Sequence, residues 1–197
     1  MDVVIARYNE NLDWINIFDD CKDVRLFVYN KSDKNWQYEG KSTMSMCSLD
    51  NIGREAHSFL HHIVSNYDNL AEKTMFLQGH PFDHEVSPSQ LVGFVEGEDK
   101  REIIPISSKK LFKCDKTGRP NHGGLPIGET YKQILPKSEK IDIYYFSSGA
   151  QYLVAKECIK NKPLKFWENL LELSVTDKKF PWTIERLWGY IYLATEV

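Results

Sequence analysis

The run from Thr74 to His84, TMFLQGHPFDH, limits the possible folds more than any other stretch of this chain. An apolar segment of β type stops at Gly79 and leads directly into His80, Asp83 and His84. Polar groups placed straight after a buried strand are costly to a core unless they are satisfied. In open α/β sheets, ligands bind beyond the carboxyl ends of the strands. The segment therefore predicts a strand that ends in a binding or catalytic site with three side chains able to bind a metal.

Composition narrows the class of protein. With 197 residues, the chain is long enough for one sizeable domain or at most two small ones. Hydrophobic residues make up 42% and charged residues 27%, which is ordinary for a soluble globular protein. The net charge of −3 argues against binding to a nucleic-acid backbone, which normally requires a basic excess.

The chain also lacks the marks of a secreted or membrane protein. Its four cysteines form no CxxC pair, which argues against a zinc ribbon or a redox dithiol and favours reduced thiols in the cytoplasm. No apolar run approaches the roughly 18 residues that span a bilayer, and the start reads as a strand and not as a signal peptide. We therefore expect a cytoplasmic protein with no membrane span.

Apolar runs alternate with segments of helical periodicity, and this alternation predicts an α/β fold with mostly parallel strands. The expected helices include a long one that carries an apolar face and a last one capped at Thr183. The predicted strands are 2–6, 24–30, 74–78 and 141–146, and the predicted helices are 12–18, 53–67, 163–174 and 183–197.

Four motifs carry a resemblance to a known family: A-R-Y-N-E, N-x-G-R-E, F-L-Q-G-H-P and E-R-L-W-G-Y. The segment DNIGREAHSFLHHIVSNYDNLAEKTMFLQGHPFDH resembles the nucleotide-sugar half of a GT-A glycosyltransferase, in which an N-x-G turn starts a helix and the next strand ends in a D-x-D metal motif. The whole set resembles a narrower group of GT-A-like domains, long catalogued without function, close to a glycosyltransferase domain of a large algal (chlorella) virus. The resemblance covers most of residues 2–192.

The resemblance implies one GT-A-like domain over residues 1–197, with a central, mostly parallel (mixed) sheet flanked by helices. Residues 1–85 would form the nucleotide-binding half and residues 86–197 the acceptor-side half. The implied activity is metal-dependent transfer of a sugar, of glucose or rhamnose type, from a UDP-sugar to a glycan or glycoprotein acceptor. If the protein is viral, it would act in glycan assembly in the host cytoplasm.

The resemblance also assigns residues that bind the nucleotide-sugar. The turn after the first strand would hold the base and ribose, the end of the second strand would complete that pocket, and a basic residue in the first turn of a helix would meet a phosphate with help from the helix dipole. The full set is Arg7, Tyr8, Asn9, Glu10, Asn30, Lys31, Arg54, Gln78, Gly79 and Gly149.

One departure from the family pattern affects the metal. Where D-x-D is expected, the chain has Gln78-Gly79-His80, and the nearest carboxylate is Asp83. We expect Mn²⁺ (or Mg²⁺) to be held by Asp83 and the diphosphate, with His80 or His84 as a second ligand, because Mn²⁺ tolerates imidazole better than Mg²⁺ does. For the catalytic base the resemblance favours Glu185, with Asp83 as the rival.

Simpler interpretations stay open for these residues. Asp83 and its neighbouring histidines could cap a turn by bonding backbone amides. Arg7 could be a structural ion-pair partner, and Arg54 could simply start a helix. Glu185 could pair with Arg186 in the first turn of the last helix.

Two other functions also stay open. H-P-F-D-H partly matches the H-x-H-x-D-H pattern of dinuclear zinc hydrolases, although Phe82 stands at the position of the middle histidine. Such a metallohydrolase would use His80, Asp83 and His84. The missing D-x-D also suggests a non-catalytic module that binds a nucleotide-sugar without turnover.

Overall fold

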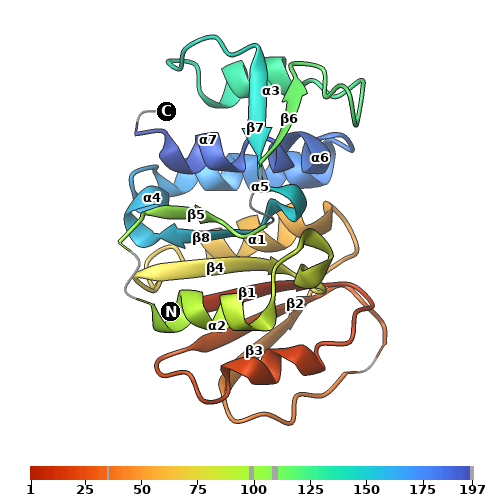
Figure 1. Ribbon diagram of the computed structural model, residues 1–197. Helices are drawn as coiled ribbons and strands as arrows, with labels where there is room; N and C mark the ends of the chain where they lie inside the picture. Colours follow the sequence, from red (N-terminus) through yellow and green to blue (C-terminus); the bar gives the residue numbers. More distant parts are fainter. Residues whose placement is uncertain (35, 98–99, 108–110, 196–197) are drawn as a thin grey trace.

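The central feature of the fold is a mixed β-sheet. The computed structural model describes residues 1–34, 36–97, 100–107 and 111–195, and among these a six-stranded sheet has the order β3-β2-β1-β4-β8-β5 (Figure 1). Strands β3, β2, β1 and β4 are parallel, whereas β8 runs antiparallel to β4 and β5. The expected α/β class with a mostly parallel, mixed sheet is confirmed. The strands are β1 (Asp2–Arg7), β2 (Arg25–Asn30), β3 (Thr43–Ser48), β4 (Lys73–Gln78), β5 (Ile103–Pro105) and β8 (Tyr152–Ala155).

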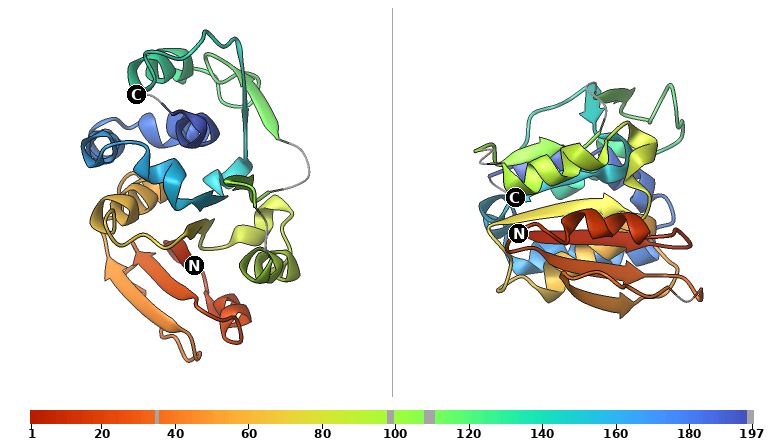
Figure 2. Two further views of the ribbon diagram at one scale, coloured as in Figure 1. Left: turned by 90° about the vertical axis from the view of Figure 1, so that its left-hand side faces the viewer. Right: turned by 60° about the horizontal axis from the view of Figure 1, so that its bottom comes forward.

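Helices cover both faces of this sheet, and a small second sheet lies beyond one edge (Figures 1 and 2). One face is covered by the 3₁₀ helix η1 and by α2, and the other by α1 with α5, α6 and α7. The second sheet has two antiparallel strands, β6 and β7, and helix α3 lies between them in the chain. The bounds are η1 (Asp13–Phe18), α1 (Arg54–Ser65), η2 (Pro81–His84), α2 (Pro88–Glu96), β6 (Phe112–Asp115), α3 (Ile127–Ile134), β7 (Ile143–Phe146), η3 (Ser148–Ala150), α4 (Lys156–Lys160), α5 (Leu164–Thr176), α6 (Phe180–Glu185) and α7 (Trp188–Leu193).

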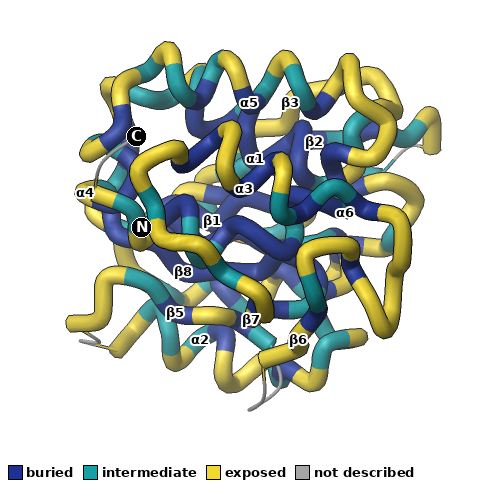
Figure 3. The backbone as a smooth tube through the Cα atoms, turned by 90° about the horizontal axis from the view of Figure 1, so that it is seen from above, coloured by how far each residue is buried: buried dark blue, intermediate teal, exposed yellow. Residues whose placement is uncertain are grey.

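Two hydrophobic clusters, one on each face, explain why the central strands are apolar throughout. In β1, Val3 and Ile5 face the cluster under η1 and α2, whereas Val4 faces the cluster under α1. In β4, Leu77 faces the cluster under η1 and α2, whereas Phe76 faces the cluster under α1. A strand covered on both faces needs apolar residues at every position and not at alternate ones. Figure 3 shows this buried backbone at the centre of the molecule, within an exposed periphery.

The predicted strand at 141–146 is confirmed as β7, but it does not belong to the main sheet. Residues Ile143–Phe146 pair with β6 in the separate two-stranded sheet. The strand that joins the main sheet is β8, a buried four-residue segment five residues further on. Its register places Tyr152 opposite Phe76 of β4 and Pro105 of β5, so the sheet gains an antiparallel strand where the alternation of elements suggested a parallel one.

The prediction of a single terminal helix capped at Thr183 was wrong. That segment forms two short helices, α6 and α7, and the first begins at Phe180, before the expected cap. Pro181 fits the first turn, where a helix needs no amide donor from that position. Thr183 lies inside α6, and its hydroxyl donates to Lys179 O (3.0 Å).

No helix among the described residues is long and apolar enough to cross a membrane.

A buried histidine joins α1 to the strands beneath it. The His62 side chain has no exposed surface; its Nδ1 lies 3.0 Å from the Tyr29 hydroxyl, and its Nε2 has no hydrogen-bond partner in the described structure and lies 3.9 Å from Asp2 Oδ2. Burial lowers the pKa of His62 to about 4, against an ordinary value of 6.5, and nearby Arg25 adds to this effect while Asp2 opposes it. The ring is therefore neutral in the folded protein at pH 7.

We predict that this histidine makes folding stability depend on pH. Because its pKa is lower in the folded than in the unfolded state, the unfolded state binds the proton better. The contribution of His62 to stability is fully present above pH 6.5 and falls as the pH drops towards 4. Lowering the pH from 7 to 4.5 should therefore reduce the free energy of unfolding by about 2.5 kcal/mol through this residue. Urea unfolding at pH 7 and pH 4.5 measures the free energy of unfolding of the wild type and of His62→Phe. Between these pH values it should fall by about 2.5 kcal/mol less in His62→Phe than in the wild type. An equal fall in both proteins would contradict the prediction.

Candidate functional site

A cavity of about 390 Å³ lies where three parallel strands end, and we call it the central cavity. The chain leaves β1 through η1 on one face of the sheet and enters β4 from α1 on the other face. Such a reversal opens a crevice at the carboxyl ends of the strands, which is where α/β sheets bind ligands. The lining residues are Ala6, Arg7, Tyr8, Glu10, Lys31, Asn51, Arg54, Glu55, Ser58, Gln78, Gly79, His80 and Asp83.

A second cavity of about 570 Å³ adjoins the first, and we call it the outer cavity. The two share Tyr8, Lys31 and Asn51, so they form a continuous hollow across the ends of β4, β1, β2 and β3. Volumes of this size are typical of sites for small molecules. Asn9 and Asn30 line the outer cavity and not the central one.

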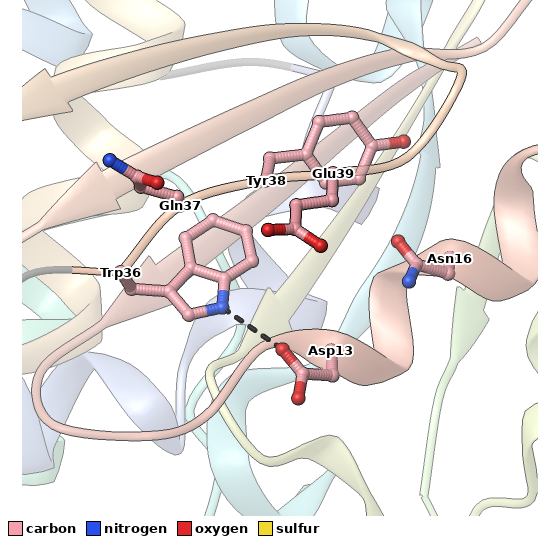
Figure 4. Close-up of a pocket in the computed structure, with 6 residues that line it drawn as sticks. All are labelled: Asp13, Asn16, Trp36, Gln37, Tyr38 and Glu39. Atoms are coloured by element: carbon pink, nitrogen blue, oxygen red, sulfur yellow. Dashed lines mark hydrogen bonds between the residues drawn. The ribbon is translucent and has the colours of Figure 1, made fainter.

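A third cavity, of about 700 Å³, lies between η1 and the loop that carries Trp36 and Glu39 (Figure 4). In Figure 4, Asp13 and Asn16 on η1 face the loop, and Trp36 Nε1 donates to Asp13 Oδ1 (3.3 Å). Its six lining residues include two carboxylates and no basic group. This cavity is larger than the central one but poorly suited to a phosphate, because its charge has the wrong sign.

The first turn of α1 faces the central cavity in an unusual conformation. Gly53 has φ 63° and Arg54 has φ 50°, so two consecutive residues are left-handed. The first amide bonded inside the helix is that of His57, which donates to Gly53 O (3.0 Å), and no side chain caps the helix. An uncapped N-terminus leaves amide donors and the positive end of the helix dipole available to an anion.

Lys31 holds this turn in place. Its Nζ donates to Ile52 O and to Arg54 O, both at 2.5 Å, and its side chain is nearly buried. Burial lowers the pKa of Lys31 to about 8, while Glu55 opposes the change. The sequence predicted that Lys31 completes a nucleotide pocket; the structure places it under the α1 turn, where it lines both cavities.

Arg54 is the more accessible cation. Its side chain is about half exposed (53%), and its Nε lies 3.6 Å from Glu55 Oε2. The guanidinium carbon lies 5.2 Å from the centroid of the Trp182 ring, a cation–π contact. The guanidinium therefore stands at the mouth of the cavity, beside the uncapped amides.

Arg7 and Asn30 form the frame between the two cavities. The Arg7 guanidinium donates to Asn30 Oδ1 (2.6 Å), to Glu10 O (3.0 Å) and to Lys34 O (3.2 Å). Asn30 also bonds the backbone of Ser32 through both its amide oxygen and its amide nitrogen. These two side chains tie the loops after β1 and β2 together, so their hydrogen bonds shape the cavity walls.

The turn after β1 packs closely against the end of β4. Glu10 Oε2 accepts from Tyr8 N (2.6 Å), and a Cβ at Gly79 would lie only 2.6 Å from that same oxygen. Gly79 O in turn accepts from Trp14 Nε1 (2.9 Å). The missing side chain at position 79 lets the Glu10 carboxylate approach the strand end. Tyr8 remains about half exposed.

The three predicted metal ligands do not come together. His80 Nδ1 lies 3.0 Å from Asp83 Oδ1, and both side chains are exposed on the rim of the central cavity. His84 points elsewhere: its Nε2 is hydrogen-bonded to Gln78 Oε1 (3.1 Å) and its Nδ1 to the Ser148 hydroxyl (3.0 Å). In the described parts of the chain, no three His, Cys, Asp or Glu residues are grouped as metal ligands.

His84 is instead part of a network that fixes the turn before β8. A Cβ at Gly149, where φ is 74°, would lie 2.4 Å from the His84 ring, so glycine is needed there. Gly149 N donates to Glu185 Oε1 (3.0 Å), and Glu185 Oε2 pairs with Arg186. Glu185 therefore holds the Gly149 turn and is not among the residues that line the central cavity.

Sequence reasoning missed four residues that line the central cavity: Ala6, Asn51, Glu55 and Ser58. Glu55 and Ser58 lie three positions apart in α1 and so share one side of the helix. That spacing is visible in the sequence, but an acid in the first turn of a helix is common and does not by itself indicate a site.

Comparisons with known proteins give a match to a family model and several distant structural likenesses. Residues 3–93, from β1 into α2, match the family model described as "Protein of unknown function (DUF3431)". A search of the curated proteins finds no match.

The structural likenesses are weak. Galactosyltransferase LgtC, in complex with donor and acceptor sugar analogues, aligns with a TM-score of 0.43 and 11% identity over 94% of this chain and 70% of its own. HddC from Yersinia pseudotuberculosis aligns with a TM-score of 0.41 and 12% identity over 82% of this chain and 80% of its own. An active-site mutant of LgtC aligns with a TM-score of 0.38 and 10% identity over 94% and 69%. Likeness at this level says nothing about activity or ligands.

We predict that the α1 turn tolerates no side chain at position 53. A Cβ at Gly53 would lie 2.5 Å from Ser174 O, and the residue has a positive φ. Gly53→Ala should therefore destabilise the protein by roughly 1–3 kcal/mol. Gly93→Ala is the matched control, because nothing lies within 4 Å of a Cβ there and Gly93 is inside helix α2. The control should stabilise by up to about 1 kcal/mol. Thermal unfolding of both variants measures the difference, and equal effects would contradict it.

Proposed function

We propose that this protein is a nucleotide-sugar-dependent glycosyltransferase, with residues 1–85 holding the donor and residues 86–197 the acceptor. The observation that carries this proposal is the convergence of three strand ends and the uncapped N-terminus of α1 on one cavity with Lys31 and Arg54 in its lining. The motifs N-x-G-R-E and F-L-Q-G-H-P, on which the resemblance to GT-A enzymes rests, supply the turn and the strand end of that cavity.

The diphosphate of the donor fits best against the first turn of α1. Amide groups of an uncapped helix and a guanidinium are the groups that phosphate oxygens accept from most strongly. Arg54 is free to reorient, since half of its side chain is exposed. Lys31 contributes positive charge from beneath the turn, and its bonds to Ile52 O and Arg54 O keep the amides in place.

The nucleoside would occupy the outer cavity. Asn9 and Tyr8 line it from the turn after β1, and Asn30 and Lys31 line it from the end of β2. Arg7 and Asn30 act here by fixing the walls, since their polar groups bond to one another and to the backbone. A UDP-sugar of glucose or rhamnose type and a glycan or glycoprotein acceptor are the substrates we propose. The sugar would then extend past Gln78 and Gly79 at the end of β4.

A divalent metal fits this site only in part. His80 and Asp83 supply one imidazole and one carboxylate on the cavity rim, a donor set that suits Mn²⁺ better than Mg²⁺. Diphosphate oxygens would have to complete the coordination. When bound, such an ion neutralises charge on the departing diphosphate. His84 is excluded from this role by its two hydrogen bonds, which also weakens the metallohydrolase alternative.

We predict that the wild-type protein binds UDP-glucose or UDP-rhamnose and that Mn²⁺ strengthens binding. Isothermal titration should show Arg54→Ala weakening binding about 10-fold, because one charge-assisted contact to phosphate is lost. Asp83→Asn should remove the enhancement by Mn²⁺ while leaving binding without metal unchanged. Lys165→Ala is the matched control for lost charge, since Lys165 lies exposed on α5 and pairs only with Glu168 among the contacts described for it.

Undetectable binding of every UDP-sugar to the wild-type protein would overturn the proposed function. Binding without release of UDP, in an assay that includes slow donor hydrolysis, would favour the non-catalytic module. Two tightly bound zinc ions per chain in metal analysis would instead favour the metallohydrolase.

A further inference from the structure

The inner wall of the central cavity carries a nearly buried carboxylate beside a serine hydroxyl that lacks a hydrogen-bond partner in the described structure. Glu55 lines the cavity, and its side chain is only 9% exposed. Its carboxylate accepts from its own backbone amide and lies 3.6 Å from Arg54 Nε, which is longer than a good hydrogen bond. Ser58 lies one turn further along α1, lines the same cavity and has no exposed surface; its Oγ has no partner in the described structure.

Buried polar atoms in folded proteins are almost always hydrogen-bonded, so the unpartnered Ser58 Oγ points to a partner that the described chain does not supply, such as a water or a ligand group. Because Glu55 and Ser58 are three residues apart on a helix, their side chains share one side. A hydroxyl group placed between them would donate its proton to the carboxylate and accept from the serine. The pair therefore suits a neutral hydroxyl group, which can donate a proton to the carboxylate as an anion without a proton cannot.

The other acidic groups near the site are less suited to this task. Glu185 is committed to Gly149 N and to Arg186, and it does not line the cavity. Asp83 lies exposed on the rim, 3.0 Å from His80. Glu10 also lines the cavity, but its Oε2 accepts from Tyr8 N (2.6 Å). Each of these three carboxylates therefore already has a hydrogen-bond partner in another residue.

We infer that Glu55 is the catalytic residue that accepts the proton of the attacking hydroxyl and that Ser58 positions this hydroxyl. This assignment rests on the glycosyltransferase function proposed above. The hydroxyl oxygen forms a bond to the anomeric carbon, and its proton passes to a carboxylate oxygen of Glu55. The bond from the anomeric carbon to the phosphate oxygen breaks, and its electron pair leaves with the diphosphate.

The charges around Glu55 support the assignment. Burial raises the pKa of Glu55 above its ordinary value of 4.5; Arg54 and Lys31 oppose the change, and Glu185 on α6 adds to it. A base with a raised pKa is a stronger proton acceptor, provided that it is ionised at the working pH. Turnover should therefore fall as the pH drops through the raised pKa of Glu55 and be constant above it.

The test measures UDP release from UDP-glucose with Mn²⁺, with water as the acceptor. Glu55→Gln should lower kcat by about 100-fold or more and abolish the acidic limb of the pH profile, while the affinity for UDP stays within about 2-fold. Glu55→Asp should retain the limb with reduced kcat. Ser58→Ala should lower kcat by about 3- to 10-fold without removing the limb.

Glu172→Gln, on the exposed side of α5, is the matched control and should behave like the wild type. Thermal unfolding of each variant shows whether it folds, and the Asp variant carries the test if the Gln variant does not. Unchanged kcat and pH profile in Glu55→Gln, with an active wild type, would overturn this assignment alone. A wild type that binds UDP but releases none from UDP-glucose would overturn both the assignment and the catalytic function. A wild type without UDP binding would overturn the donor site itself.

Discussion

The left-handed turn at Gly53 and Arg54 is the constraint on which the candidate site depends. Two consecutive residues with positive φ place the start of α1 against the ends of β1 and β2, and such a conformation is strained for Arg54. The strain is offset locally: Lys31 Nζ bonds the carbonyls on both sides of Gly53, and Gly53 itself has no room for a Cβ beneath Ser174 O. A buried lysine is expensive unless its proton donors are used, and here two backbone oxygens use them. The turn, the lysine and the glycine therefore require one another.

Much of the central sheet could be predicted from the sequence, and the reason is burial on both faces. Strands β1, β2 and β4 are the innermost parallel strands, so apolar residues run through them without alternation and stand out in the sequence. Strand β3 was not predicted because it lies at the edge of the sheet and most of its residues are exposed, which leaves no apolar run. Strand β8 was missed because it is only four residues long and follows another short strand that looks like it in sequence.

The candidate site was predictable where it depends on strand ends and unpredictable where it depends on helix rotation. His80 and Asp83 follow a buried strand directly, so any parallel sheet brings them to the cavity rim. His84 is only one residue further on, but the 3₁₀ turn of η2 directs its ring towards Gln78 and Ser148. Glu55 owes its place in the cavity to the way α1 packs on α5 and α6, and this long-range packing leaves no local signal.

The environments of two carboxylates in one cavity decide what each can do. Asp83 is exposed and pairs with an imidazole, so water and a neighbouring ring already satisfy it and a cation can approach from the rim. Glu55, in the first turn of α1, is nearly buried. Its partner Arg54 is held partly away from it by a cation–π contact with the Trp182 ring. Groups of the same type acquire different roles when they differ in exposure and in their neighbours. An accessible carboxylate at the rim suits a metal ion and phosphate, whereas a desolvated one at the inner wall suits a proton. The two functions can share this small cavity because one carboxylate lies on its rim and the other in its wall.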